Sequence, residues 1–235
     1  MSKRGPLTRP MHEPQSRRRF MTVAAAVIAG VDVGLAGSWS ALAQTSLSPD
    51  AALTRLLDGN RRFVDKRLTS FQDDLTILQQ NSVEKQEPFA AVLSCSDSRV
   101  PVELVFDQTI GHIFVARVAG NVASAEVIAS LEYGVAVLGT AVLMVMGHGS
   151  CGAVKAAIGG KAVPGQISAL YRYIRPAIDA AGADLDAATM ANARIQAKLL
   201  RESSPVIAEH VAQGTLQVVA SQYDLATGKV TILKS

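Results

Sequence analysis

Two short stretches of this 235-residue chain carry residue types that bind metals. Cys95 opens the sequence Cys-Ser-Asp-Ser-Arg, and further along the chain His148 stands three positions before Cys151. These two cysteines are the only ones in the chain. Two thiolates and one imidazole, with a fourth position left for water, are a donor set typical of a catalytic zinc site. The sequence therefore predicts one metal centre formed by Cys95, His148 and Cys151.

The elements that would position these residues can be read from the runs before them. Residues 89–94 and 141–146 are apolar runs, typical of strands buried on both faces of a parallel sheet. Ligand groups in such sheets gather at the carboxyl ends of the strands, so the two loops are expected to meet there. Alternating strands and helices along the chain predict an α/β fold with a mostly parallel central β-sheet flanked by helices. Further strands are expected at residues 113–118, 216–223 and 230–233, and helices at residues 73–81, 102–106, 123–138, 151–158, 167–181, 187–201 and 205–213.

The two metal-binding stretches together resemble a family signature. The pattern C-x-D-x-R followed by H-x-x-C is similar to that of the β-class carbonic anhydrases, and the similarity extends from about residue 47 to the end of the chain. It implies one Zn²⁺ per chain and the reversible hydration of carbon dioxide to bicarbonate and a proton by zinc-bound hydroxide. Blocks in the family order stand at residues 94–101, 114–121, 130–133, 147–154 and 223–230.

The resemblance also implies roles for residues around the metal. Arg99 would hold Asp97 in a bidentate pair, and Asp97 would accept a hydrogen bond from the zinc-bound hydroxide or, in a closed state, bind the metal itself. The alternative for this pair is an ordinary surface ion pair. The residues that resemble the family's substrate cleft, or that would let the backbone approach the metal, are Gln86, Phe114, Tyr133, Gly120 and Gly152.

Two positions leave the interpretation open. His112 stands where related sequences often carry an acidic residue, and it is either a proton acceptor near the cleft mouth or a surface-loop histidine.

Ser48, Pro49 and Asp50 predict the start of a helix that contains Gly59-Asn60. In the family this arm packs against a partner subunit, but the sequence equally allows a helix on its own domain. The resemblance implies a homodimer or tetramer, with the cleft where two subunits meet.

Two other functions fit the same residues. Relatives of this fold hydrolyse carbonyl sulfide or carbon disulfide, and the metal ligands do not separate these substrates from carbon dioxide. The second alternative is a non-catalytic exported protein held together by structural zinc or by a Cys95–Cys151 disulfide. A purely structural site does not need Asp97 and Arg99, so the sequence favours an enzyme.

The N-terminal segment is interpreted as a targeting signal and not as part of the fold. Residues 16–21, Ser-Arg-Arg-Arg-Phe-Met, resemble a twin-arginine export signal, and Ala41-Leu42-Ala43 is a cleavage site. We expect a signal peptide at residues 1–43, a catalytic domain at residues 44–235 and a periplasmic protein with no stable membrane insertion after cleavage. The formal charge of +3 depends on this segment, because the remainder holds 17 basic and 18 acidic residues. Nucleic-acid binding is therefore not expected.

Overall fold

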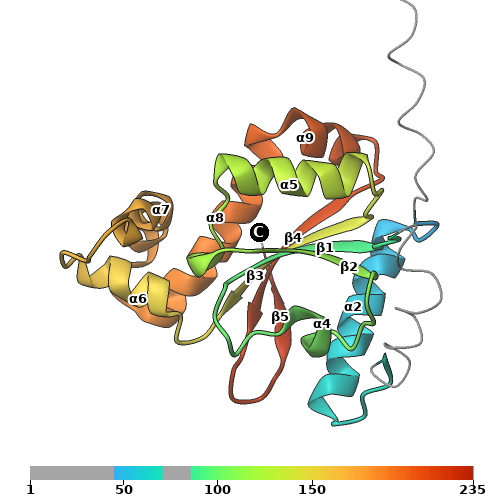
Figure 1. The fold of residues 1–235 in the computed structure, drawn as a ribbon, viewed down its shortest axis with the longest axis horizontal. Coiled ribbons are helices and arrows are strands. Elements are labelled where there is room, and N and C mark those ends of the chain that lie inside the picture. Colours follow the sequence, from blue (N-terminus) through green and yellow to red (C-terminus); the bar gives the residue numbers. More distant parts are fainter. Residues whose placement is uncertain (1–44, 71–85, 235) are drawn as a thin grey trace, which may run out of the picture. The chain divides into compact units, whose positions relative to one another are not determined.

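The computed structural model describes residues 45–70 and 86–234, and within them the strands form one five-stranded sheet (Figure 1). The strand order is β2-β1-β3-β4-β5. All neighbouring pairs are parallel except β4 and β5, so the predicted mostly parallel sheet is confirmed. The strands are β1 (Ala90–Ser94), β2 (Ile113–Arg117), β3 (Val142–His148), β4 (Gln217–Tyr223) and β5 (Val230–Leu233).

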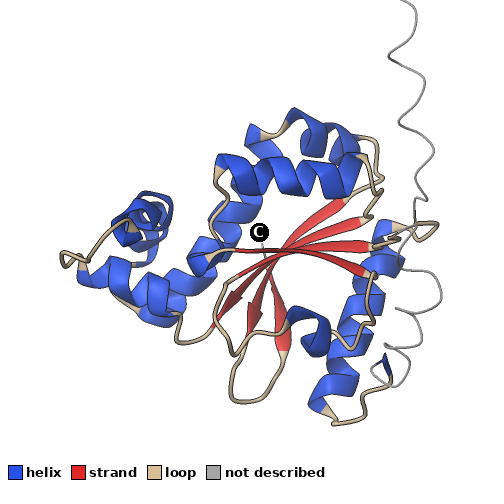
Figure 2. Cartoon of the chain, in the orientation of Figure 1, coloured by secondary structure: helices blue, strands red, loops and turns tan. Residues whose placement is uncertain are grey.

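Helices cover both faces of this sheet (Figure 2). In the described part of the chain, no helix is both long enough and apolar enough to cross a membrane. The predicted helix at residues 73–81 and the signal segment at residues 1–43 lie outside the described residues. The α-helices are α2 (Pro49–Val64), α4 (Val102–Val105), α5 (Ala125–Ala136), α6 (Gly152–Gly159), α7 (Tyr171–Ala181), α8 (Leu185–Ser203) and α9 (Pro205–Ala212), with 3-10 turns η2 (Ala119–Asn121) and η3 (Ile167–Leu170).

The central strands β1 and β3 are buried over their whole length, as their unbroken apolar sequences predicted. Successive side chains point to opposite faces. Val92 and Met144 pack against α2 and α4 on one face, whereas Leu93 and Val145 pack against α5, α8 and α9 on the other. Two hydrophobic layers thus fix the two strands whose ends carry the metal-binding residues.

One predicted helix is divided in the structure. Residues 167–181 form the 3-10 turn η3 and then α7, and not one continuous helix. The tighter turn begins where Ala169 N–H donates to Gln166 O at 3.0 Å, an i to i+3 bond. The other predicted helices within the described residues are present, with ends that differ by a few positions.

The helix α2, whose location the sequence left open, packs on the sheet of its own chain. The Ser48 side chain caps it by accepting from Ala51 N–H at 3.3 Å. Leu56 is fully buried in the hydrophobic layer on that face. Gly59 permits a close approach, because a Cβ there would stand 1.7 Å from Phe106 O. The helix therefore contributes to the core of the single chain.

Asn60 joins this helix to two other parts of the chain. Its Nδ2 donates to Val105 O at 3.1 Å and to Gly228 O at 2.8 Å. Its Oδ1 accepts from Val230 N–H at 2.9 Å. Asn60 is only 4% exposed, and Val105 and Val230 are also buried, so these backbone groups have little access to water. Asn60 thus links α2 to α4 and to the β4–β5 hairpin.

We expect Asn60→Ala to lower the free energy of unfolding by about 2–4 kcal/mol, because three buried backbone groups lose their partners. Urea unfolding of the purified protein would measure this change. Thr54→Ala is the control, because Thr54 lies on the same helix but is exposed. Equal stability of the two variants would contradict the role assigned to Asn60.

Candidate metal centre

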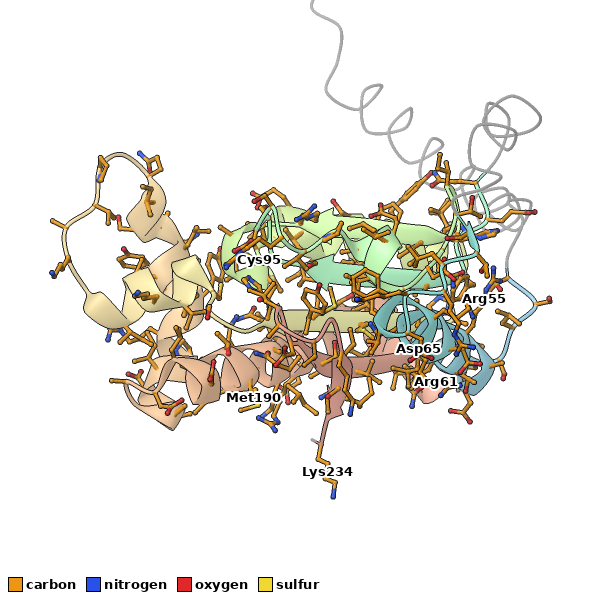
Figure 3. The ribbon with its side chains drawn as sticks, turned by 90° about the horizontal axis from the view of Figure 1, so that it is seen from below. Arg55, Arg61, Asp65, Cys95, Met190 and Lys234 are labelled. Carbon is orange, nitrogen blue, oxygen red and sulfur yellow. The ribbon has the colours of Figure 1, made fainter. Side chains whose placement is uncertain are left out.

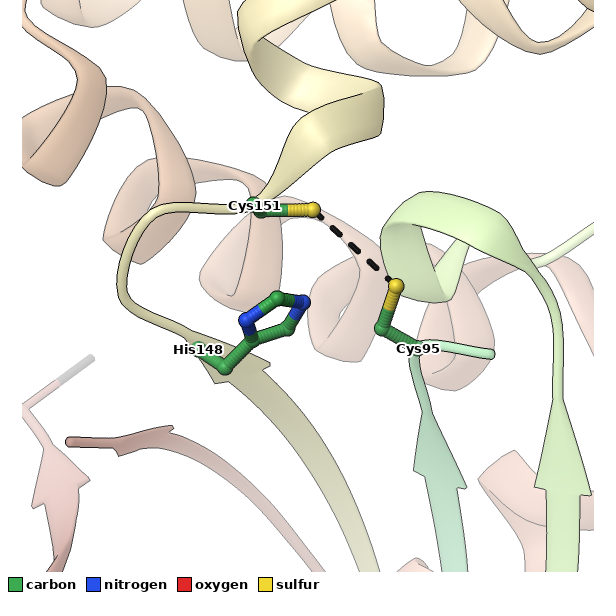
Figure 4. A group of neighbouring side chains, drawn as sticks. All are labelled: Cys95, His148 and Cys151. Atoms are coloured by element: carbon green, nitrogen blue, oxygen red, sulfur yellow. Dashed lines mark hydrogen bonds between the residues drawn. The ribbon is translucent and has the colours of Figure 1, made fainter. Parts of the chain in front are cut away.

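The three predicted ligands meet at the carboxyl end of the sheet. Cys95 directly follows β1, His148 is the last residue of β3, and Cys151 precedes α6. Because β1 and β3 are paired neighbours running in parallel, their ends lie at the same edge. The Sγ atoms of both cysteines and a ring nitrogen of His148 all lie within 4.8 Å of one another (Figure 4). All three residues are buried.

His148 has the tautomer that a metal ligand requires. Its Nδ1–H donates to Gly149 O at 2.9 Å, which leaves the lone pair on Nε2. Nε2 is buried and has no hydrogen-bond partner. The imidazole lies beside the two sulfur atoms (Figure 4). A buried nitrogen lone pair without a partner is costly, and a metal ion would satisfy it.

The two cysteines are free thiols, so the alternative of a disulfide does not hold in this structure. Their Sγ atoms are 4.0 Å apart, about twice the ~2.05 Å of a disulfide bond. The hydrogen bond from Cys151, followed by those from the Gly120 and Asp97 amides, outweighs burial and lowers the pKa of Cys95 to about 4. The same bond, burial and the charge on Cys95 raise the pKa of Cys151.

The donor set fits zinc. Two sulfurs share one proton when no cation is present, and a divalent cation would replace that proton and hold both as thiolates. Thiolates and imidazole are the ligands that structural and catalytic zinc sites use. Val122, Val154 and Ile174 pack around the two cysteines and keep this pocket apolar. The Cys95-His148-Cys151 cluster is thus a zinc site of the type predicted.

Asp97 and Arg99 form the predicted pair beside this cluster. Arg99 Nε and Nη2 donate to Asp97 Oδ1 and Oδ2 at 2.9 and 2.8 Å, and Arg99 N–H donates to Oδ1 at 3.0 Å. These hydrogen bonds keep the pKa of Asp97 below its usual range. Asp97 Oδ2 lies 3.9 Å from His148 Nε2, so the carboxylate faces the metal position without belonging to the cluster.

Arg117 at the end of β2 also holds the ligand loop, a role that the sequence analysis did not predict. Its Nε donates to Cys95 O at 3.0 Å and its Nη2 to Asp97 O at 2.7 Å. Arg117 lies within a block that resembles the family, but nothing in its residue type or spacing indicated that it would bind these carbonyls. Its guanidinium fixes the loop between a metal ligand and the Asp97 carboxylate.

Two predicted cleft aromatics lie together on β2 and α5. The rings of Phe114 and Tyr133 are 6.2 Å apart, and Tyr133 is 44% exposed. Phe114 also contributes to the hydrophobic layer under α5. Gly120 N–H donates to Cys95 Sγ at 3.3 Å, which places this glycine at the metal site. At Gly152 an added Cβ would meet nothing within 4 Å, so sterics alone do not require glycine there.

Two residues lie at the other end of the sheet. Gln86 precedes β1, whereas Cys95 follows it, so Gln86 does not lie at the metal site of its own chain. His112 precedes β2, whose five residues separate it from the Cys95 loop by roughly 17 Å. His112 Nδ1 lies 3.3 Å from Arg55 Nη2, and Figure 3 shows Arg55 at the opposite end from Cys95. The interpretation of His112 as a proton acceptor beside the metal of its own chain is therefore wrong.

The fold and the site agree with what known proteins show. The family model described as carbonic anhydrase matches residues 90–230. A carbonic anhydrase of Mycolicibacterium smegmatis is 34% identical over 79% of this chain and 93% of its own length. A carbonic anhydrase of Pseudomonas aeruginosa is 35% identical over 63% of this chain and 74% of its own.

Solved structures give the same result. The β-carbonic anhydrase CcaA superimposes with a TM-score of 0.61 and 26% identity, over 77% of this chain and 87% of its own. The β-carbonic anhydrase of Coccomyxa gives 0.60 and 27%, over 77% and 86%. The residues that the family model matches include strands β1 to β4 and all three residues of the Cys-His-Cys site, and the chain belongs to the β-class carbonic anhydrase family.

Proposed function

We propose that this chain is a zinc-dependent carbonic anhydrase, which reversibly hydrates carbon dioxide to bicarbonate and a proton. The observation that carries the proposal is the Asp97 carboxylate, held bidentately by Arg99 and 3.9 Å from the unpartnered Nε2 of His148. Zinc bound by two thiolates and an imidazole would lower the pKa of a water molecule and so supply a nucleophile. Family membership and the donor set support this activity.

The residues beside the metal position would orient that nucleophile. Asp97 is ionised because Arg99 lowers its pKa, so both carboxylate oxygens are hydrogen-bond acceptors. An acceptor at this place receives the nucleophile's O–H and turns an oxygen lone pair toward the carbon of carbon dioxide. The two N–H bonds from the Arg99 guanidinium occupy both carboxylate oxygens of Asp97, which supports the open arrangement of the two predicted states.

Carbonyl sulfide or carbon disulfide remains the alternative substrate, because the same metal and carboxylate could hydrolyse either. The non-catalytic alternative is less favoured, since the Asp97–Arg99 pair serves no structural zinc site. Family relatives that carry the name carbonic anhydrase favour carbon dioxide. Assays with carbon dioxide and with carbonyl sulfide on the same zinc-loaded sample would separate the two substrates.

We expect purified protein to contain about one zinc per chain and to hydrate carbon dioxide. The rate should rise through neutral pH, because zinc lowers the pKa of bound water toward ~7 and the nucleophile forms when that water loses its proton. His148→Ala should lose both zinc and activity, as measured by elemental analysis and stopped-flow hydration. His210→Ala is the control, because His210 lies on α9 and contacts Thr215, away from the three ligands. Activity without zinc, or zinc without activity toward either substrate, would contradict the proposal.

Asp97→Ala should lower the hydration kcat about 100-fold, because an oriented nucleophile loses its acceptor. Zinc content should be unchanged, since Asp97 is not among the three ligands. Ser98→Ala is the matched control, because Ser98 is the exposed residue between Asp97 and Arg99. If Asp97→Ala keeps the activity of Ser98→Ala, the role of Asp97 as an acceptor is wrong.

We propose in addition that the chain works as a homodimer or tetramer. β2 is an edge strand of the described sheet, and Tyr133 exposes 44% of its surface beside it. Gln86, at the opposite end of β1 from Cys95, would approach the substrate only from a second subunit. A monomer in sedimentation equilibrium at assay concentrations would contradict this proposal.

We propose that residues 1–43 direct export to the periplasm by the twin-arginine route, with cleavage between Ala43 and Gln44. Changing Arg17 and Arg18 together to Lys preserves the charge of the segment but removes the arginine pair on which the resemblance rests. We expect this double variant to remain in the cytoplasm in a fractionation blot, whereas Arg4→Lys is exported normally. Equal export of both would contradict the assigned route.

A further inference from the structure

A pair of buried amides on α8 lies behind the metal site. Asn192 and Gln196 are each 1% exposed and stand one helical turn apart. Gln196 Nε2 donates to Asn192 Oδ1 at 3.2 Å. Their neighbours on the helix, Ala193 and Ala197, are part of the hydrophobic layer. Two carboxamides in such surroundings are costly unless every polar atom has a partner, so their bonding partners indicate what they do.

Both amides bind the turn that follows β2. Asn192 Nδ2 donates to Gly120 O at 2.8 Å, and Gln196 Oε1 accepts from Ala123 N–H at 2.9 Å. Gln196 Nε2 also donates to Tyr173 O at 3.0 Å, which fixes the amide's orientation. The two side chains therefore hold the η2 turn at Gly120 and the segment directly after it at Ala123.

The η2 turn, held in this way, donates a hydrogen bond to a predicted metal ligand. Gly120 N–H donates to Cys95 Sγ at 3.3 Å. Gly120 has φ +76°, in the left-handed region, and a Cβ there would stand 3.0 Å from Ile174 Cδ1. The backbone at this point is thus in a conformation that other residues rarely adopt. Asn192 anchors the carbonyl of the same residue whose N–H reaches the sulfur.

An N–H···S bond withdraws electron density from a thiolate and weakens its donation to a metal. We propose that Asn192 and Gln196 are positioning residues that set the donor strength of the Cys95 thiolate by holding Gly120 N–H against its sulfur. This inference rests on the proposed zinc function, because it assumes that Cys95 binds the metal. A less electron-rich thiolate leaves more positive charge on zinc and so favours ionisation of water.

Asn192→Leu removes the donor to Gly120 at similar volume and provides the first test. In protein loaded with Co²⁺, the thiolate-to-metal charge-transfer band should move to longer wavelength, because the sulfur becomes a stronger donor. The hydration kcat of the zinc form should fall roughly 10-fold, at the lower end of the effect of residues behind metal ligands. KM should stay near that of the unmodified protein.

Thr189→Val is the matched control. Thr189 is also buried on α8, but its hydroxyl bonds Asp186 O and Gln222 and not the η2 turn. It should change stability without moving the band. If Asn192→Leu loses stability while its band coincides with that of Thr189→Val, the two amides only support the core and the proposal is overturned.

A measurement on the unmodified protein keeps the proposal testable if Asn192→Leu does not fold. In protein loaded with ¹¹³Cd, the Gly120 amide proton should show scalar coupling to the metal through the N–H···S bond, and absence of that coupling would overturn the proposal. Failure of the underlying function looks different. If the cobalt form has no thiolate charge-transfer band at all, Cys95 is not a ligand and the proposed zinc function falls as well.

Discussion

The structure of this site depends on two buried sulfur atoms 4.0 Å apart. Two negative charges at that separation in an apolar pocket repel strongly, so only one thiolate forms unless a cation lies between them. The opposite shifts of the Cys95 and Cys151 pKa express this constraint. His148 adds a buried nitrogen without a hydrogen-bond partner at the same place. Each of the three groups is incompletely satisfied alone, and one divalent cation would satisfy all of them.

The sheet brings these groups together without strain in the ligands themselves. β1 and β3 pair in parallel, with Ser94 opposite Met146, so the chain leaves the sheet at neighbouring points after both strands. Hydrophobic layers on both faces hold the two strands in that register. Arg117 then fixes the first loop through two backbone carbonyls. The burial of apolar side chains far from the metal therefore contributes to assembling the metal site.

The sequence predicted the parts of the site that depend on continuous patterns. The apolar runs before Cys95 and His148 predicted buried strands, and parallel pairing then brings their ends together. Contacts between a side chain and a distant backbone group have no such pattern, so the roles of Arg117 and Asn192 could not be read from the chain. The register of β2 decided the place of His112, and the sequence gives no register. The packing of α2 on the sheet of its own chain could also be seen only in the folded structure, because the apolar face of this helix could equally have packed on a partner subunit.

Arg99 shows why the carboxylate and the metal ligands act as one unit. The guanidinium of Arg99 makes two hydrogen bonds to the Asp97 carboxylate, and its Nη2 also donates to Ser150 O at 3.4 Å, in the loop between His148 and Cys151. One guanidinium thus joins the loop of the first ligand to the loop of the other two. Lysine could not replace it, because an ammonium group lacks the two parallel N–H donors with which a planar guanidinium binds both carboxylate oxygens. Displacing either loop would therefore move the Asp97 carboxylate as well, so the geometry of the metal and the orientation of the nucleophile are coupled through this residue.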